Sequence, residues 1–193
     1  FAARRGDFSA ALDYLDRSLA ANPLYILALT LKAAVLRHLN RAKEALAALD
    51  IAQKIDPLDV RIEAERWLAG SKKITGELAA TFAGHPSTSL ETATEYGNAG
   101  LWQDGTNILA LASLSTSKAI RGQRINPLRW YYRAQFAERL GQNREATDYR
   151  FLASILRTDY VLPFQWEAIH VLRRAMELNP KDANAPHLLG NLL

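Results

Sequence analysis

Small and large apolar residues recur along this chain with the spacing of one face of an α-helix. The recurring frame is a small residue, a large apolar residue four positions later, a second small residue three further on, and a proline five further on. These steps place the first three side chains on one helix face, where the small ones let a neighbouring helix approach closely. The proline ends the helix, because it disfavours the α conformation of the residue before it. The frame occurs in residues 11–23, 45–57 and 168–180.

Asparagine or aspartate precedes several of the prolines, which indicates where helices begin. The side-chain oxygen of such a residue can cap free helix amides, and proline suits the first helical turn. One helix then ends and the next begins within a few residues, so consecutive helices are antiparallel neighbours. The pattern predicts an all-α fold of antiparallel helix pairs, with about a dozen helices. The pairs of residues are Asn22-Pro23, Asp56-Pro57, Asn126-Pro127 and Asn179-Pro180.

The middle of the chain departs from this regular pattern. The first two segments are displaced by 34 residues, but the closing prolines at 57 and 180 are 123 residues apart, which is not a multiple of 34. Arg150 stands where the frame has a large apolar residue, so we expect its helix pair to pack differently. We expect a helix in residues 71–83, a long loop or short extra helix in 113–126, and an ordered connection in 158–163.

The frame resembles the second helix of the tetratricopeptide repeat, with leucine in place of the usual phenylalanine. The first helix of that repeat is matched by Leu189-Gly190-x2-Leu193, whereas Lys32 occupies a position where leucine is usual. The resemblance implies a right-handed solenoid of helix pairs. It implies one domain over residues 1–193, with regular repeats at 6–57 and 164–193 and degenerate repeats at 58–160.

A weaker resemblance, from Asp159 to Leu193, is to the repeat region of large bacterial proteins whose front portion is β-rich and mutarotase-like. It implies a bacterial, carbohydrate-related parent protein. We expect the chain to be a fragment of such a protein, because it begins inside one helix of a repeat and stops inside another. We also expect a cytoplasmic location. Solenoid ends normally need a polar capping helix, so we expect the open ends to self-associate.

Composition excludes several kinds of site. The chain has no cysteine, and its four histidines lie far apart without the spacing of metal ligands, so we expect no metal site. It contains no recognisable catalytic motif, so we expect no catalytic residue, no cofactor and no enzyme activity. Gly97, Gly100 and Gly105 lack the lysine of a phosphate loop and instead predict a turn and close helix approach. No stretch reaches the ~20 apolar residues of a membrane helix, so we expect no membrane partner.

Helical-repeat proteins bind partners along a concave surface lined by the first helix of each pair. In residues 127–140, the packing stripe through Trp130 and Ala134 leaves Tyr131 and Tyr132 for other faces. Exposed tyrosines beside glutamine and arginine are typical of contact surfaces. The alternative is that both rings pack against the next helix. The predicted groove residues are Tyr131, Tyr132, Gln135, Arg139, Arg37, His38, Arg61, Glu65 and Asn98.

These observations favour a non-catalytic scaffold module that binds a protein or peptide. The net charge of +4 is spread along the chain and does little to indicate a nucleic-acid partner. RNA binding is the first alternative, and it requires several arginines to converge on one face, namely Arg61, Arg66, Arg129 and Arg133. The second alternative is that the module supports or oligomerises a carbohydrate-active enzyme.

Overall fold

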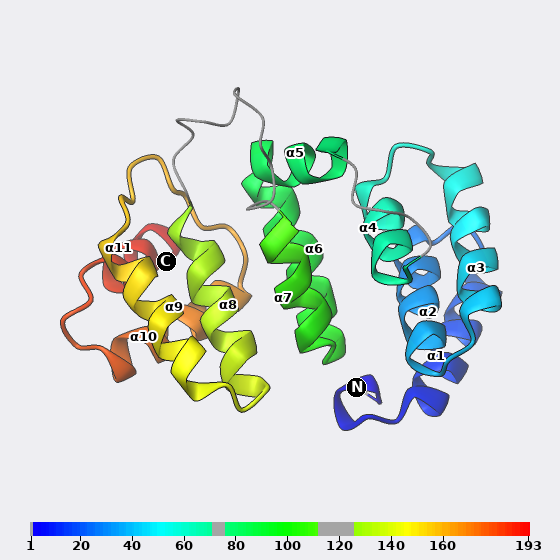
Figure 1. Ribbon diagram of the computed structural model, residues 1–193, viewed down its shortest axis with the longest axis horizontal. Helices are drawn as coiled ribbons and strands as arrows, with labels where there is room; N and C mark the ends of the chain where they lie inside the picture. Colours follow the sequence, from blue (N-terminus) through cyan, green and yellow to red (C-terminus); the bar gives the residue numbers. More distant parts are fainter. Residues whose placement is uncertain (1, 71–75, 112–125) are drawn as a thin grey trace. The chain divides into compact units, whose positions relative to one another are not determined.

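The computed structural model describes residues 2–70, 76–111 and 126–193, and every regular element in these ranges is helical (Figure 1). This confirms the all-α fold class. The expectations for residues 71–75 and for the loop at 113–125 lie outside the described residues. The elements are a short 3-10 helix η1 (Ala3–Arg5) and helices α1 (Phe8–Ala21), α2 (Ile26–His38), α3 (Ala42–Ile55), α4 (Val60–Leu68), α5 (Gly76–Gly84), α6 (Pro86–Ala99), α7 (Trp102–Leu111), α8 (Pro127–Arg139), α9 (Asn143–Ile155), α10 (Glu167–Leu178) and α11 (Asn184–Leu192).

The chain divides into two compact units. One comprises residues 1–78 and 98–101, and the other comprises residues 79–97 and 102–193. Each is described by itself below. The prediction that all 193 residues form one repeat domain stays a prediction.

In the first unit, α2 packs against α1, α3 and α4. The repeated frame lies where the spacing predicted: Ala45, Leu49 and Ala52 form one fully buried face of α3. They contact a core to which α2 contributes Leu29 and Leu36. The small residues at both ends of the frame let α3 approach its neighbours closely.

The burial of the frame gives a direct test of its role. Ala45 in the first unit and Ala168 in the second have essentially no exposed surface. Leucine at either position should overpack the helix contact and lower the free energy of unfolding by about 1–3 kcal/mol. Chemical denaturation of the two single variants would measure this. Ala20, which is exposed on α1, is the matched control, and its replacement by leucine should change stability little. Unchanged stability of both test variants would contradict the packing role.

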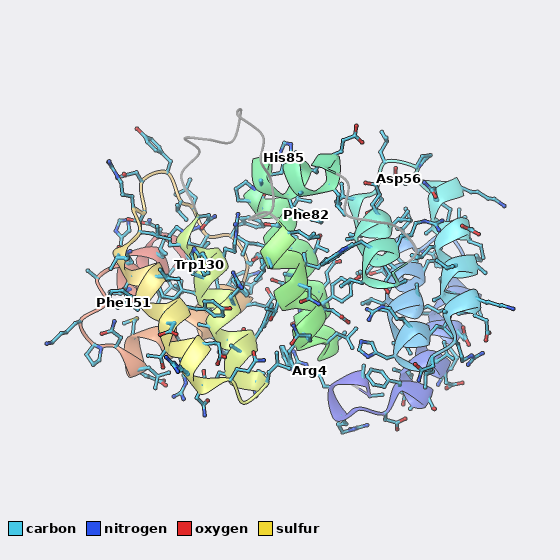
Figure 2. The ribbon with its side chains drawn as sticks, in the orientation of Figure 1. Arg4, Asp56, Phe82, His85, Trp130 and Phe151 are labelled. Atoms are coloured by element: carbon cyan, nitrogen blue, oxygen red, sulfur yellow. The ribbon has the colours of Figure 1, made fainter. Side chains whose placement is uncertain are left out.

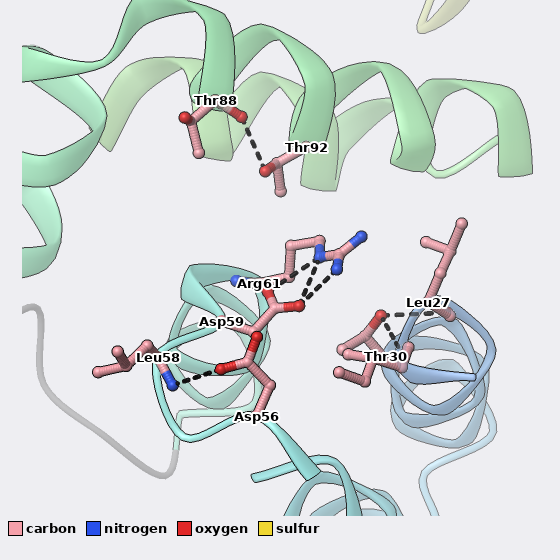
Figure 3. Close-up of polar contacts among 9 residues, drawn as sticks. Leu27, Thr30, Asp56, Leu58, Asp59, Arg61, Thr88 and Thr92 are labelled. Carbon is pink, nitrogen blue, oxygen red and sulfur yellow. Dashed lines mark hydrogen bonds and ion pairs between the residues drawn. The ribbon is translucent and has the colours of Figure 1, made fainter. Parts of the chain in front are cut away.

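Three of the four predicted helix starts are wrong, because the residue before proline forms a turn instead of a helix cap. The side chains of Asn22, Asp56 and Asn179 each accept a hydrogen bond from the backbone amide two residues later, which forms a turn. Figure 3 shows this contact between Asp56 and Leu58. The next helix begins only after the turn, at Ile26, at Val60 and at Asn184. Asn126 alone behaves as predicted: it caps α8, and Pro127 occupies the first helical position.

In the second unit, α8 packs against α7, α9 and α10, and α11 packs against α9 and α10. The last four helices therefore contact one another in a closed cycle, in the order α8, α9, α11, α10 and back to α8. Arg150 of α9, at the position expected for a large apolar residue, keeps its side chain mostly buried and lies 3.6 Å from the carboxylate of Glu138 on α8. An interhelical ion pair thus replaces an apolar contact, and the helix pair α8–α9 departs from the regular frame.

Two glycines allow α6 and α7 to pack closely on α8. A Cβ atom at Gly97 would lie 2.7 Å from the ring of Phe136, and one at Gly105 would lie 2.8 Å from the same ring. Both distances are too short for non-bonded carbon atoms, so the ring fits only because neither residue has a side chain. This confirms that these glycines serve helix packing.

Candidate functional site

Tyr131 and Tyr132 are core residues, so the interpretation that placed them on an open groove is wrong. Each ring is only 1% exposed. Tyr132 packs edge-on against Phe136 with ring centroids 6.2 Å apart. The sequence pattern failed because α8 has neighbours on several sides, α7, α9 and α10, and buries more than one stripe. Burial raises the pKa of both phenols, so both hydroxyls stay protonated.

The hydroxyl of Tyr131 belongs to a buried polar cluster that joins three helices. It donates a 2.7 Å hydrogen bond to the carboxylate of Asp182, just before α11. The other oxygen of Asp182 accepts hydrogen bonds from the backbone amides of Asn184 and Ala185, the first two residues of α11. The side-chain amide of Asn184 in turn donates to the last carbonyls of α9, those of Ala153, Ser154 and Leu156. The cluster is structural and offers no open surface.

A groove of about 440 Å³ lies between α8 and α10. It contains two predicted residues, Gln135 and Arg139, together with Glu138 from the same helix. His170 and Arg174 line it from α10. Residues three or four positions apart lie on one face of a helix, which is why each helix presents these side chains together.

The groove carries an excess of positive charge. Glu138 accepts a 2.7 Å hydrogen bond from Arg174, and this bond, followed by the charges of Arg150 and Arg174, lowers the pKa of Glu138. Arg174 also contacts Glu177 at 3.1 Å. The guanidinium of Arg139 lies over the ring of Trp102, 5.7 Å from the ring centroid, and forms no ion pair within 4 Å among the described residues.

Two groove side chains have no partner within the described part of the chain. Neither the amide of Gln135 nor the imidazole of His170 forms a hydrogen bond or ion pair there. Both can therefore contact a ligand without breaking an existing interaction. The groove can hold polar and anionic groups, with Arg139 and Arg174 as donors.

The remaining predicted residues lie elsewhere and are mostly engaged in structural contacts. Glu65 of α4 is fully buried and accepts a 2.8 Å hydrogen bond from Arg37 of α2. His38 stacks on Phe8, with ring centroids 4.8 Å apart. Arg61 pairs with Asp59, the residue that caps α4 (Figure 3). Asn98 is exposed in the last turn of α6.

Sequence reasoning missed His170 and Arg174 as groove residues. His170 and Arg174 are four positions apart, on a helix whose packing face is marked by Ala168 and Leu172. They could have been recognised as a second face of α10. Nothing in the sequence indicated that α10 packs against α8, two helices earlier. Short connections lead one to expect contacts between consecutive helices instead.

The arginines required by the RNA alternative are engaged in the fold. Arg66 pairs with Asp50, as Arg61 does with Asp59. Arg129 is buried, and burial lowers its pKa. The guanidinium of Arg133 contacts the faces of Trp130 and Tyr149, 4.8 Å and 4.4 Å from the ring centroids. Trp130 can be found on α8 in Figure 2.

Within the described ranges, no three His, Asp or Glu side chains come together as a metal site. In the same ranges, no helix has the length and apolar character needed to cross a membrane.

Comparison with known proteins gives one partial similarity. The human (Homo sapiens) protein N-alpha-acetyltransferase 16, NatA auxiliary subunit, is 28% identical over 94 residues. The matched region covers 47% of this chain and 11% of that protein, so the chain spans only a small part of its relative's length. No model of a known protein family and no solved structure matches the chain. The chain is thus an all-helical protein that is similar, over about half its length, to part of an auxiliary subunit.

Proposed function

We propose that this chain is a non-catalytic scaffold module of a larger protein, and that its α8–α10 groove binds an acidic segment of a partner protein. The observation that carries the proposal is the positive groove in which Gln135 and His170 have no partner among the described residues. The relative's description as an auxiliary subunit supports a role in assembly. Origin in a bacterial protein and a location in the cytoplasm stay predictions.

The charge of the groove favours an acidic segment over a basic one. Arg139 and Arg174 line it, and the nearby acids Glu138 and Glu177 already contact Arg174. A carboxylate of a partner can accept hydrogen bonds from the guanidinium of Arg139 and from a ring N–H of His170. A lysine-rich segment would meet like charges instead.

The test uses two short fluorescein-labelled peptides of equal length, one rich in glutamate and one rich in lysine. We expect the purified chain to bind the acidic peptide in fluorescence anisotropy at low salt, and the Arg139→Glu variant to bind it about tenfold more weakly, since the new carboxylate repels the ligand. Arg144→Glu is the matched control, because Arg144 is an exposed arginine of the same unit outside the groove. Binding should weaken as salt is added.

Three outcomes would contradict the proposal: no binding of the acidic peptide, equal binding of the lysine peptide, or equal effects of the two arginine variants. Tighter binding of a single-stranded RNA oligonucleotide than of the acidic peptide would favour the RNA alternative. The carbohydrate-enzyme alternative concerns the parent protein, and it is compatible with a scaffold role of this module.

A further inference from the structure

The connection between α9 and α10 presents a row of large apolar side chains to solvent. Tyr160, Leu162, Phe164 and Trp166 are 94%, 74%, 55% and 78% exposed. They alternate with less exposed residues, as side chains do along an extended chain. These four residues form the apolar row.

The intervening residues hold the connection against the helices. Pro163 is buried and Val161 is half-buried. Both line a hollow of about 170 Å³, together with Leu90 of α6 and Leu128 of α8. Tyr160, Leu162 and Phe164 of the apolar row border the same hollow, so the row lies at its rim with its side chains still largely exposed. The buried Pro163 holds the connection in place beside the hollow. The expectation of an ordered connection in residues 158–163 agrees with this arrangement.

The backbone of the connection is poorly suited to pairing with a strand. Pro163 has no N–H group, and the N–H of Val161 already donates to the carbonyl of Thr158. Tyr160 adopts a left-handed conformation with φ of 62°, which interrupts an extended edge. A partner must therefore contact the side chains of the row rather than add a strand to it.

The size of the row fits a small protein interface. An aromatic side chain can bury about 150–250 Å², so the row exposes on the order of 500 Å². That area is within the range of the largest apolar patches on monomeric proteins, which are often functional. Two copies of the row in contact would bury on the order of 1,000 Å², near the lower limit for a specific interface.

The charges around the apolar row permit contact between the rows of two copies of the chain. Residues 160–166 carry no charged side chain. At one end of the row Arg157 forms an ion pair with Asp159, with 2.7 Å between nitrogen and oxygen. A two-fold arrangement would bring this neutral pair near Glu167 of the partner subunit, without repulsion between net like charges. We propose that the apolar row is a homodimer interface, independent of the α8–α10 groove.

Sedimentation velocity over a range of protein concentrations tests this proposal. We expect a reversible monomer–dimer equilibrium, weak because the interface is small, with a dissociation constant on the order of 10 μM. Leu162→Asp should weaken the dimer by at least about tenfold, because it would bury a carboxylate without a partner. Circular dichroism of the same variant should stay unchanged, since the side chain of Leu162 is largely exposed.

Two further aspartate variants serve as controls. Leu58 is an exposed leucine of the first unit, and Leu193 is exposed at the end of the chain. Neither Leu58→Asp nor Leu193→Asp should change the dimer. A monomer at every concentration would overturn the proposal, as would a dimer that Leu162→Asp leaves intact. A dimer that only Leu193→Asp disrupts would instead assign self-association to the surface around α11 and would also overturn the proposal.

Discussion

Replacing Tyr131 or Tyr132 by alanine should lower the free energy of unfolding by about 3–5 kcal/mol, as is found for other buried aromatic residues. Both rings are almost completely buried, so each substitution removes packed apolar surface and leaves a cavity. A domain is typically stable by only about 5–15 kcal/mol, so the double variant should not fold. Urea denaturation of each single variant, followed by circular dichroism, would measure the loss.

Tyr14 provides the matched control for this prediction. It lies on α1 with more than half of its side chain exposed. Tyr14→Ala should change the stability by less than about 0.5 kcal/mol. If either core variant proved as stable as the Tyr14 variant, the assignment of Tyr131 and Tyr132 to the core would be wrong.

The second large effect should come from Asp182. Alanine at this position removes the acceptor for two amides at the start of α11, a loss comparable to that of a helix cap, about 1 kcal/mol. It also leaves the hydroxyl of Tyr131 buried without its partner, which costs about 1–3 kcal/mol. We therefore expect Asp182→Ala to lower the free energy of unfolding by about 2–4 kcal/mol, measured by urea denaturation.

Tyr131→Phe separates the two contributions. It removes the hydroxyl but keeps the ring and the hydrogen bonds between Asp182 and α11, so its own cost should be about 1 kcal/mol. In the Tyr131→Phe background, Asp182→Ala should cost less than it does in the native chain, because no hydroxyl is left unsatisfied. Strict additivity of the two substitutions would show that the hydrogen bond from Tyr131 to Asp182 contributes nothing.

The helical fold could be predicted because it depends on local pattern. The buried face of α3, through Ala45 and Leu49, follows from the spacing alone. The positions of Tyr131 and Tyr132 could not be predicted in the same way. Which further faces of α8 are buried depends on contacts with α7 and α10, which are distant in sequence. The same contact between α8 and α10 creates the groove, so Gln135 and Arg139 were predicted but their neighbours on α10 were not.

Aspartate or asparagine before proline predicted three helix starts wrongly, because these residues have two alternative structural roles. The side chains of Asn22, Asp56 and Asn179 can cap a helix or close a turn, and both uses require the same residue types. In this chain the turn forms in these three cases. Only Asn126 acts as a cap, at the start of α8.

The amide of Asn184 has a consequence for how the end of the chain opens. In a simple repeat array each unit contacts only its neighbours, so the last helix can fray while the rest stays folded. Here the first residue of α11 supplies hydrogen bonds to the carbonyls that end α9. If α11 detaches, those carbonyls lose their donor, and the end of α9 is destabilised with it. Opening of α11 is thereby coupled to α9, whose Ala153 lies 31 positions before Asn184. The two helices should open as one cooperative segment.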